Sequence, residues 1–73
     1  MKGIDMKIKM LKNVDVDEEF PRLGEIHPKY LVRHNIYRID SVEILNDKVA
    51  NVVLDDGNVL LEVPTDSFEM SSK

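Results

Sequence analysis

An acidic stretch after residue 12 contains side chains that could bind a metal ion. Asn13, Asp15 and Asp17 place oxygen atoms at alternate positions, which is how a calcium-binding loop begins. Such a loop then requires glycine at its sixth position and a bidentate glutamate at its twelfth. This chain has Glu18 and Gly24 at those positions. We therefore interpret the stretch as a solvated acidic loop and predict no metal site.

Acid–base or nucleophilic catalysis would have to use His27, His34 or the neighbouring carboxylates of Asp55 and Asp56. The chain has no cysteine, and its serines do not stand in a recognisable nucleophile motif. Neither the zinc-protease helix motif nor a phosphate-binding glycine loop is present. The two aspartates precede Gly57, so turn formation accounts for them. We predict that the chain is not an enzyme and needs no cofactor.

Length and composition indicate one small globular domain. Of the 73 residues, 42% are hydrophobic and 22 are Val, Ile or Leu, which is too aliphatic for a disordered acidic tail. No apolar run approaches the ~20 residues that cross a bilayer. Without cysteine there is neither a disulfide framework nor a thiolate metal site. Residues 1–5 lack the apolar stretch of a secretion signal, so we expect a single cytoplasmic domain over residues 1–73.

Charge is unevenly distributed along the chain. Residues 1–38 carry eight basic and six acidic side chains, whereas residues 39–73 carry two basic and eight acidic ones. Nucleic-acid binding normally needs a concentrated basic face, because neutralisation of phosphates supplies much of the affinity. The residues that could form such a face here are Lys7, Lys9, Lys12, Arg33 and Arg38, together with Tyr37. We interpret the lysines as a solvated strand face and keep nucleic-acid binding as an alternative.

The dominant apolar period is two residues, which indicates β-strands. Residues 6–10 alternate apolar side chains with lysines, and residues 36–44 predict a second strand that bends at Asp40–Ser41. The pair Asn46–Asp47 predicts a turn before a third strand over residues 48–54. With the two further strands described below, five short strands are expected. They suggest a small barrel, because an isolated hairpin is not stable in water and a closed sheet protects its edges.

The run from Asp55 to Gly57 between two apolar segments predicts a tight hairpin, since glycine adopts positive φ angles without steric cost. Residues 59–63 are then the fourth strand, and Pro64 ends it because proline has no N–H for the ladder. Residues 65–67 suit a single helical turn, and residues 68–70 a short last strand. Residues 1–5 and 71–73 are expected to be frayed ends.

Residues 15–35 predict a long, ordered first loop. Two prolines and one glycine within eight residues exclude a long helix or a central strand. Long loops inside compact domains are uncommon and often functional. We expect the loop to be held by Phe20, Leu23, Ile26 and Tyr30. Leu23 and Ile26 are expected to point inward, and Arg22 and Tyr30 outward.

Three segments carry a resemblance to a known family: Tyr-Arg-Ile at 37–39, Val-Val-Leu-Asp-Asp-Gly at 52–57, and Val-Pro-Thr-Asp-Ser-Phe-Glu at 63–69. They resemble the small Src-homology-3-like (SH3-like) barrels of short proteins from bacteriophages and their bacterial hosts, over residues 6–14 and 31–70. The resemblance implies an all-β, five-stranded barrel with a long first loop and a short helical turn before the last strand. Asn35 stands near a position where that group has glycine, and asparagine also tolerates left-handed backbone angles.

A binding function would use one of two surfaces. Aromatic and arginine side chains are enriched at interface hot spots, and an acidic face would attract a basic partner through its long-range field. The candidate residues in the long loop are Phe20, Arg22, Tyr30, Arg33 and His34. The candidate residues of an acidic face are Asp40, Glu43, Asp47, Asp55, Asp56 and Glu62.

We therefore expect a non-enzymatic protein-interaction module. The resemblance implies an accessory protein of a phage or mobile element that binds and modulates a protein in the cytoplasm of its bacterial host. A homodimer would add stability, because a core of this size contributes only ~3–5 kcal/mol. Two alternatives remain: a nucleic-acid-binding barrel that uses the basic first strand, and an oligomer that binds a small ligand between its subunits.

Overall fold

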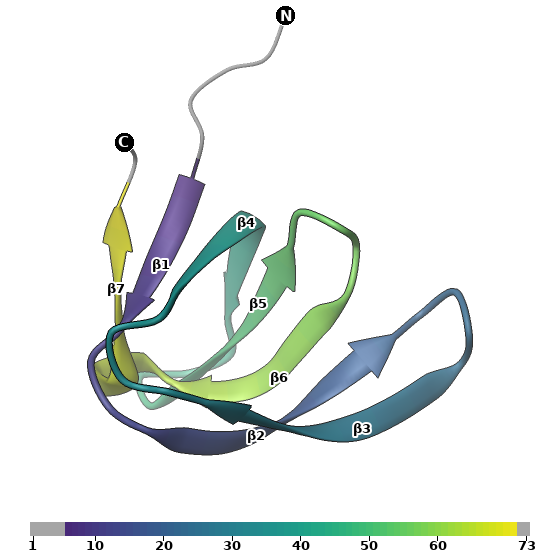
Figure 1. The fold of residues 1–73 in the computed structure, drawn as a ribbon, viewed down its shortest axis with the longest axis horizontal. Coiled ribbons are helices and arrows are strands. Elements are labelled where there is room, and N and C mark those ends of the chain that lie inside the picture. Colours follow the sequence, from purple (N-terminus) through teal and green to yellow (C-terminus); the bar gives the residue numbers. More distant parts are fainter. Residues whose placement is uncertain (1–5, 72–73) are drawn as a thin grey trace, which may run out of the picture.

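The computed structural model describes residues 6–71, which form seven β-strands and one short 3-10 helix (Figure 1). The elements in chain order are β1 (Met6–Met10), β2 (Val14–Phe20), β3 (Glu25–Leu31), β4 (Ile36–Ile44), β5 (Val49–Leu54), β6 (Val59–Pro64), η1 (Thr65–Ser67) and β7 (Phe68–Ser71). Fraying was predicted for residues 1–5 and 71–73. Residues 1–5 and 72–73 lie outside the described residues, whereas Ser71 belongs to β7.

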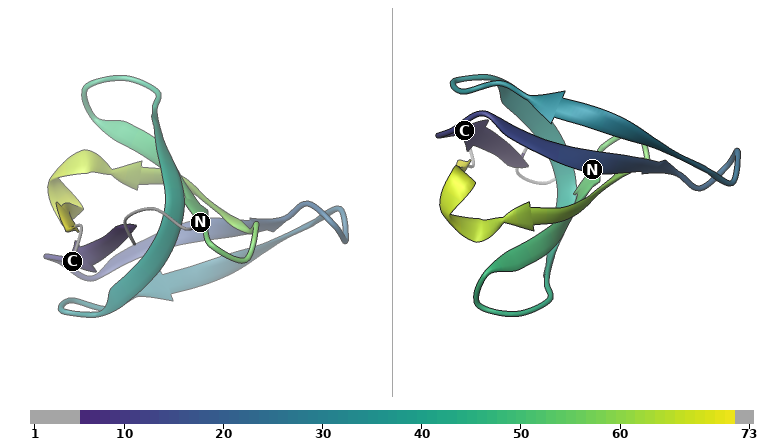
Figure 2. Two further views of the ribbon diagram at one scale, coloured as in Figure 1. Left: turned by 90° about the horizontal axis from the view of Figure 1, so that it is seen from above. Right: turned by 90° about the horizontal axis from the view of Figure 1, so that it is seen from below.

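All paired strands are antiparallel and form one sheet in the order β3-β2-β6-β5-β4-β1-β7. Three strands separate β1 from β2 in this order, although the two are joined by residues 11–13 alone. Such a short connection requires the sheet to curl, and Figures 1 and 2 show this curvature from three directions. Within the described residues β3 and β7 remain the two edges of the sheet, so the sheet is not closed.

The prediction of an all-β fold is confirmed, but the prediction of a five-stranded barrel is wrong. The two additional strands are β2 and β3, which lie in the segment that was expected to be a long loop. Valines alternate with acidic residues at the start of β2, which suits a half-buried strand. Proline excludes a central strand but not an edge strand, and Pro28 lies in β3 at the edge of the sheet.

The hydrophobic core lies on the inner face of the curled sheet. Its buried residues are Ile8, Met10, Leu31, Ile39, Ala50, Val52, Leu60, Val63 and Phe68. One of these nine, Leu31, comes from the β2–β3 hairpin, and the other eight come from β1 and β4–β7. Ser67 is also buried, and its hydroxyl donates a hydrogen bond to the carbonyl of Pro64 at 2.6 Å. We call β1 and β4–β7 the body of the molecule.

The turns of the body follow their sequence signals. Asn46 Oδ1 accepts hydrogen bonds from the backbone N–H groups of Lys48 and Val49, at 2.7 and 3.0 Å, in the β4–β5 turn. Gly57 closes the β5–β6 turn with a φ of 94°, which glycine tolerates. The predicted bend of the second strand is present as a shift in register at Asp40, between β4 and β5. The predicted helical turn before the last strand is η1.

Candidate functional site

The candidate site is the hairpin formed by β2 and β3, which projects from the body (Figure 1). The two strands pair along their whole length, from Val14 opposite Leu31 to Phe20 opposite Glu25. β2 also pairs with β6, over residues 17–19, whereas β3 has no second neighbour in the described part of the chain. β6 therefore supports β2 over the three residues that precede Phe20, and the turn at the tip extends beyond this paired segment.

A four-residue turn from Pro21 to Gly24 closes the hairpin at its tip. The carbonyl of Phe20 accepts hydrogen bonds from the N–H groups of Leu23 and Gly24, at 3.0 and 2.9 Å. Gly24 has a φ of 67°, in the left-handed region that glycine adopts without strain. Proline fixes its own φ near the value that the start of such a turn needs. Local sequence thus explains why the chain reverses here.

Side chains on the inner face of the hairpin contact one another and the body of the molecule. The rings of Phe20 and His27 meet edge to face, with centroids 5.4 Å apart and an interplanar angle of 71°. His27 Nε2 also lies 2.9 Å from Glu25 Oε1. Asn58 in the β5–β6 turn donates from Nδ2 to Glu18 Oε2 at 3.0 Å, which joins the hairpin to the body. His27 thus contacts Phe20 and Glu25 within the hairpin, and its side chain remains 56% exposed.

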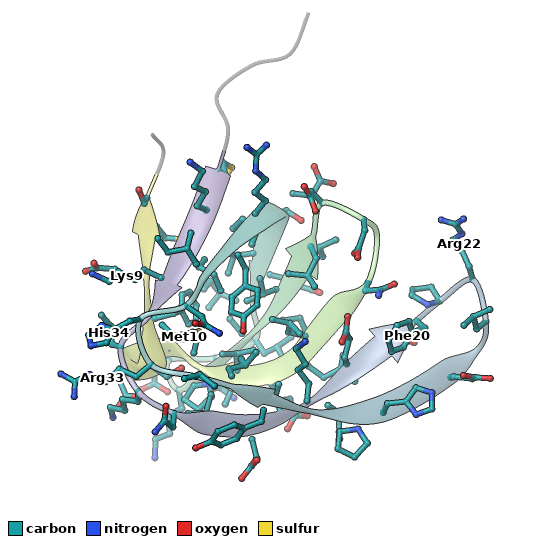
Figure 3. The ribbon with its side chains drawn as sticks, in the orientation of Figure 1. Lys9, Met10, Phe20, Arg22, Arg33 and His34 are labelled. Carbon is teal, nitrogen blue, oxygen red and sulfur yellow. The ribbon has the colours of Figure 1, made fainter. Side chains whose placement is uncertain are left out.

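A small depression lies where the hairpin tip meets the β5–β6 turn. It has a volume of about 230 Å³ and is lined by Phe20, Arg22, Leu23 and Asn58. Figure 3 shows Phe20 on the hairpin near the tip and Arg22 at the tip itself. Ligand pockets usually measure roughly 300–1,000 Å³, so this depression suits a single side chain of a partner better than a separate small molecule.

The outer face of the hairpin combines acidic and apolar side chains. Residues directly opposite each other in an antiparallel pair share a face of the sheet. The opposed pairs on this face are Asp15–Tyr30, Asp17–Pro28 and Glu19–Ile26. We call the three acidic residues the β2 acidic row and the three apolar residues the β3 apolar column. Ile26 and Tyr30 are 55% and 54% exposed, so this face can bind a partner surface that is both cationic and apolar.

The structure does not bring the five predicted loop residues together. Phe20 and Arg22 lie near the tip of the hairpin, and Tyr30 lies on its outer face. Arg33 and His34 lie in the β3–β4 turn, at the opposite end of the hairpin from Arg22 (Figure 3). The five residues therefore lie at three places, namely the tip, the outer face and the β3–β4 turn, and do not form one patch.

The expected inward orientation of Leu23 and Ile26 is wrong. Leu23 is 66% exposed at the tip, and Ile26 is 55% exposed on the outer face. The β2 acidic row was missed as a candidate because its residues were interpreted as parts of a solvated loop. The strict alternation of valine and aspartate in residues 14–17 was the signal that could have revealed a strand with one acidic face.

The β3–β4 turn holds Arg33 and His34 against the end of β1. The N–H of Arg33 donates to Asn13 Oδ1 at 2.7 Å, and the N–H of His34 donates to the carbonyl of Met10 at 2.8 Å. His34 has a φ of 78°, in a region that favours glycine. The left-handed position therefore belongs to His34, the residue before Asn35.

The six candidate residues of an acidic face are exposed, but they are spread over the body. Asp47 lies in the β4–β5 turn and Asp55–Asp56 in the β5–β6 turn, so the length of β5 separates them. Asp40 and Glu43 lie on β4, whereas Glu62 lies on β6 with a φ of 52°. The β2 acidic row, by contrast, places three carboxylates at alternate positions on one face of one strand.

The basic first strand is partly neutralised by acidic neighbours. Lys9 on β1 is directly opposite Glu69 on β7. Lys12, which follows β1, has its ammonium group 3.0 Å from Asp66 Oδ2. A surface on which cations alternate with carboxylates attracts phosphate groups less than an unbroken basic face does.

A second, larger depression lies between the β4–β5 turn and η1. Its volume is about 450 Å³, and it is lined by Asp47, Lys48, Val49, Pro64, Thr65 and Asp66. Thr65 donates from its N–H to the carbonyl of Lys48 at 2.9 Å and from its hydroxyl to the carbonyl of Asp47 at 3.1 Å. Both donors of Thr65 are therefore used within the protein and are not directed at a ligand.

The described residues contain no cluster of three histidine, aspartate or glutamate side chains that could hold a metal ion. The two histidines lie in different places, His27 on the hairpin and His34 in the β3–β4 turn. Between residues 6 and 71 no helix has the length and apolar character required to span a membrane.

Comparison with known proteins finds no match for this chain. No protein-family model matches the chain, and neither does any curated protein or solved structure.

Proposed function

We propose that this chain is a non-enzymatic protein-interaction module that binds another protein through the β2–β3 hairpin. The observation that carries the proposal is the concentration of uncovered apolar surface on this element. Of the nine large hydrophobic side chains that are exposed within residues 6–71, three lie on the hairpin and a fourth, Val32, follows β3 directly. Exposed apolar groups that gather on one element are typical of an interaction surface, whereas single ones need no explanation.

The charge of the hairpin supports a protein partner over a nucleic acid. The β2 acidic row lies between two strands that carry apolar side chains, and phosphate groups would be repelled there. In the basic region that the nucleic-acid alternative requires, Lys9 on β1 is opposite Glu69, and Lys12 after β1 is paired with Asp66. The hairpin is therefore the better candidate for the site.

The arrangement of the elements supports the resemblance to SH3-like proteins as a proposal about the fold. β1 pairs with both β4 and β7, the hairpin occupies the place of a long first loop, and η1 precedes β7. The resemblance also favours a bacterial or phage origin, with a host protein as partner. A bacterial lysate is therefore the natural source in which to search for that partner.

The test is affinity capture from bacterial lysate, with and without nuclease, using a matched pair of variants. The hairpin variant combines Leu23→Ser with Ile26→Thr. The control combines Ile36→Thr with Ile44→Thr on β4, where the two side chains are 60% and 63% exposed. We expect a stoichiometric protein that survives nuclease and is captured by the wild type and the control but not by the hairpin variant.

Two outcomes would contradict the proposal. Capture of nucleic acid alone would favour the alternative that uses the basic first strand. Equal capture by the hairpin variant and the control would place the binding surface outside the hairpin. The partner could also be a second copy of the chain, and sedimentation of the purified protein tests this case. A homodimer that the hairpin variant disrupts would identify the second copy as the partner.

A further inference from the structure

The outer face of the hairpin continues without interruption onto β6. β2 pairs with β6 through Asp17 opposite Leu61 and Glu19 opposite Val59, so these four side chains share the face that carries the β3 apolar column. Leu61 and Val59 are half-buried. Asp17 and Glu19 of the β2 acidic row are therefore flanked by apolar side chains on both sides, on β3 and on β6, and Asp15 on the β3 side.

The dimensions of this pattern match an α-helix. Neighbouring strands lie about 4.8 Å apart, so the apolar side chains of β3 and β6 are separated by about 9.5 Å across the acidic row. An α-helix with its side chains is about 10–12 Å wide and can contact both. Alternate residues of a strand are about 6.7 Å apart, and helix residues four positions apart are about 6 Å apart along the axis. Three cations at that spacing could each approach one carboxylate.

The edge of β3 is unsuited to the alternative of adding a strand. Pro28 lies at the middle of β3 and has no N–H to donate. Within a sheet, proline is confined to places where that missing donor faces solvent, so it is the free edge of β3 that lacks the hydrogen-bond donor. A partner strand would find an interrupted ladder there. The partner therefore lies across the outer face and does not extend the sheet.

A second copy of the chain is less suited to this face than a basic partner. The chain has a formal net charge of −4, so two copies repel each other at long range. The acidic row adds to that repulsion where two such faces would meet. A cationic partner instead gains from the same field, which raises the rate of association.

We propose that the outer face of the hairpin binds an amphipathic helix of a partner protein. The helix carries lysine or arginine at every fourth position, as a row that meets the β2 acidic row. Apolar side chains on both sides of that basic row contact the β3 apolar column and the Leu61–Val59 side of β6. This inference rests on the proposed function, because it names the kind of partner that the hairpin binds.

The experiment measures the binding of two synthetic helical peptides of about 20 residues, a length at which an alanine-rich sequence is helical. The first peptide has three lysines four positions apart with leucines on both sides. The second has the same composition, but its lysines are distributed around the helix. By fluorescence anisotropy we expect the first peptide to bind about tenfold more tightly than the second, and this ratio to decrease as salt is raised.

Two charge variants test the location of the site. Asp15→Asn with Asp17→Asn removes two charges from the acidic row, and Asp47→Asn with Asp55→Asn removes two charges from turns of the body. All four aspartates are exposed, so both variants should fold. We expect the first variant to bind the lysine-row peptide about fivefold more weakly and the second to bind it as the wild type does. Amide chemical shifts should change at Ile26, Tyr30 and Leu61 more than at His27.

Three results would overturn the inference. They are no binding of the lysine-row peptide, equal binding of the two peptides, and equal weakening by the two charge variants. If any of these occurs while a lysate protein still requires Leu23 and Ile26, the proposed function holds and the helix inference fails. If hairpin-dependent capture is also absent, both fail. Shift changes confined to His27 and Phe20 would place the peptide on the inner face and would also contradict the inference.

Discussion

The body and the hairpin are built from the same kind of strand, but they are held in place differently. β5 and β6 in the body contribute four of the nine buried core residues, whereas β3 in the hairpin has five exposed residues and buries Leu31 alone. Burial of apolar surface stabilises the body by ~25 cal/mol for each Å² removed from water. The hairpin packs against the core mainly through Leu31, Val14 and Val16 on its inner face, so its outer face remains available for contacts with other molecules.

The difference shows how a small chain can separate stability from binding. Eight of the nine buried core residues lie in β1 and β4–β7, whereas the acidic residues of the proposed site all lie on β2 and its most exposed apolar residues on β3. Changes at the outer face of the hairpin should therefore alter binding with little cost to folding. Each of the following predictions tests how far this separation extends.

The largest difference is expected between a core leucine and a hairpin isoleucine. Leu60 is fully buried, and Leu60→Ala should lower the free energy of unfolding by ~2–5 kcal/mol through the cavity it leaves. Ile26 is 55% exposed, so Ile26→Ala should change that free energy by less than ~0.5 kcal/mol. Urea denaturation followed by circular dichroism measures both. Similar losses would mean that the hairpin is part of the cooperative core.

The two turn glycines allow a matched test of the same comparison. An added Cβ meets nothing within 4 Å at Gly57 or at Gly24, so the cost of alanine comes from the backbone angle alone. Gly57→Ala in the body, at a φ of 94°, should destabilise by ~1–3 kcal/mol. Gly24→Ala at the tip should cost ~1 kcal/mol or less, because its φ of 67° is closer to the left-handed minimum and the tip can open locally. Thermal unfolding measures both variants. A larger loss of stability for Gly24→Ala than for Gly57→Ala would contradict the prediction.

The hydrogen bond between Asn58 and Glu18 joins the body to the hairpin, so its strength indicates how tightly these two regions are coupled. A double-mutant cycle with Asn58→Ala and Glu18→Ala should give an interaction free energy of ~0.5–1.5 kcal/mol, because the bond is partly buried. The control cycle pairs Asn58→Ala with Glu25→Ala, whose carboxylate contacts His27 instead, and should be additive. If the control cycle gave an interaction free energy as large as that of the Asn58–Glu18 cycle, the coupling would reflect a general change in the hairpin and not this hydrogen bond.

The smallest effect is expected at the ion pair between Lys12 and Asp66. Their side chains are 55% and 74% exposed, so solvent screens the interaction. Asp66→Asn should lower the free energy of unfolding by less than ~0.5 kcal/mol, and the loss should disappear in 1 M salt. A loss of several kcal/mol in chemical denaturation would show that the connection between β1 and β2 is held mainly by charge.

Sequence reasoning predicted the body well because its signals are local. The alternation of residues 6–10, the turn at Asn46 and the Asp-Asp-Gly run each depend on neighbours within a few positions. Proline at 64 and the single helical turn after it depend on backbone chemistry that any tertiary context would share. Strand boundaries in this region consequently agree with expectation to within a residue or two.

The hairpin was predicted as a loop because its prolines and its glycine were given more weight than its alternating valines. Proline is compatible with an edge strand, and the sequence does not say which strand will be at the edge. The position of Asp17 opposite Leu61 joins residues far apart in the chain, and no local pattern indicates such a pairing. For the same reason Leu23 and Ile26 were expected inside, although they are exposed.

The sequence by itself determined the strand-forming segments of the body, the turns between them and the separation of charge along the chain, because each arises from the chemistry of neighbouring residues. Tertiary structure alone decided that β3 is an edge, that β2 pairs with β6, and that the carboxylates of residues 15, 17 and 19 align between apolar side chains. A face of a sheet consists of residues from several strands, so its composition depends on register between distant segments. The proposed binding surface therefore exists only once the strands have paired in the folded protein.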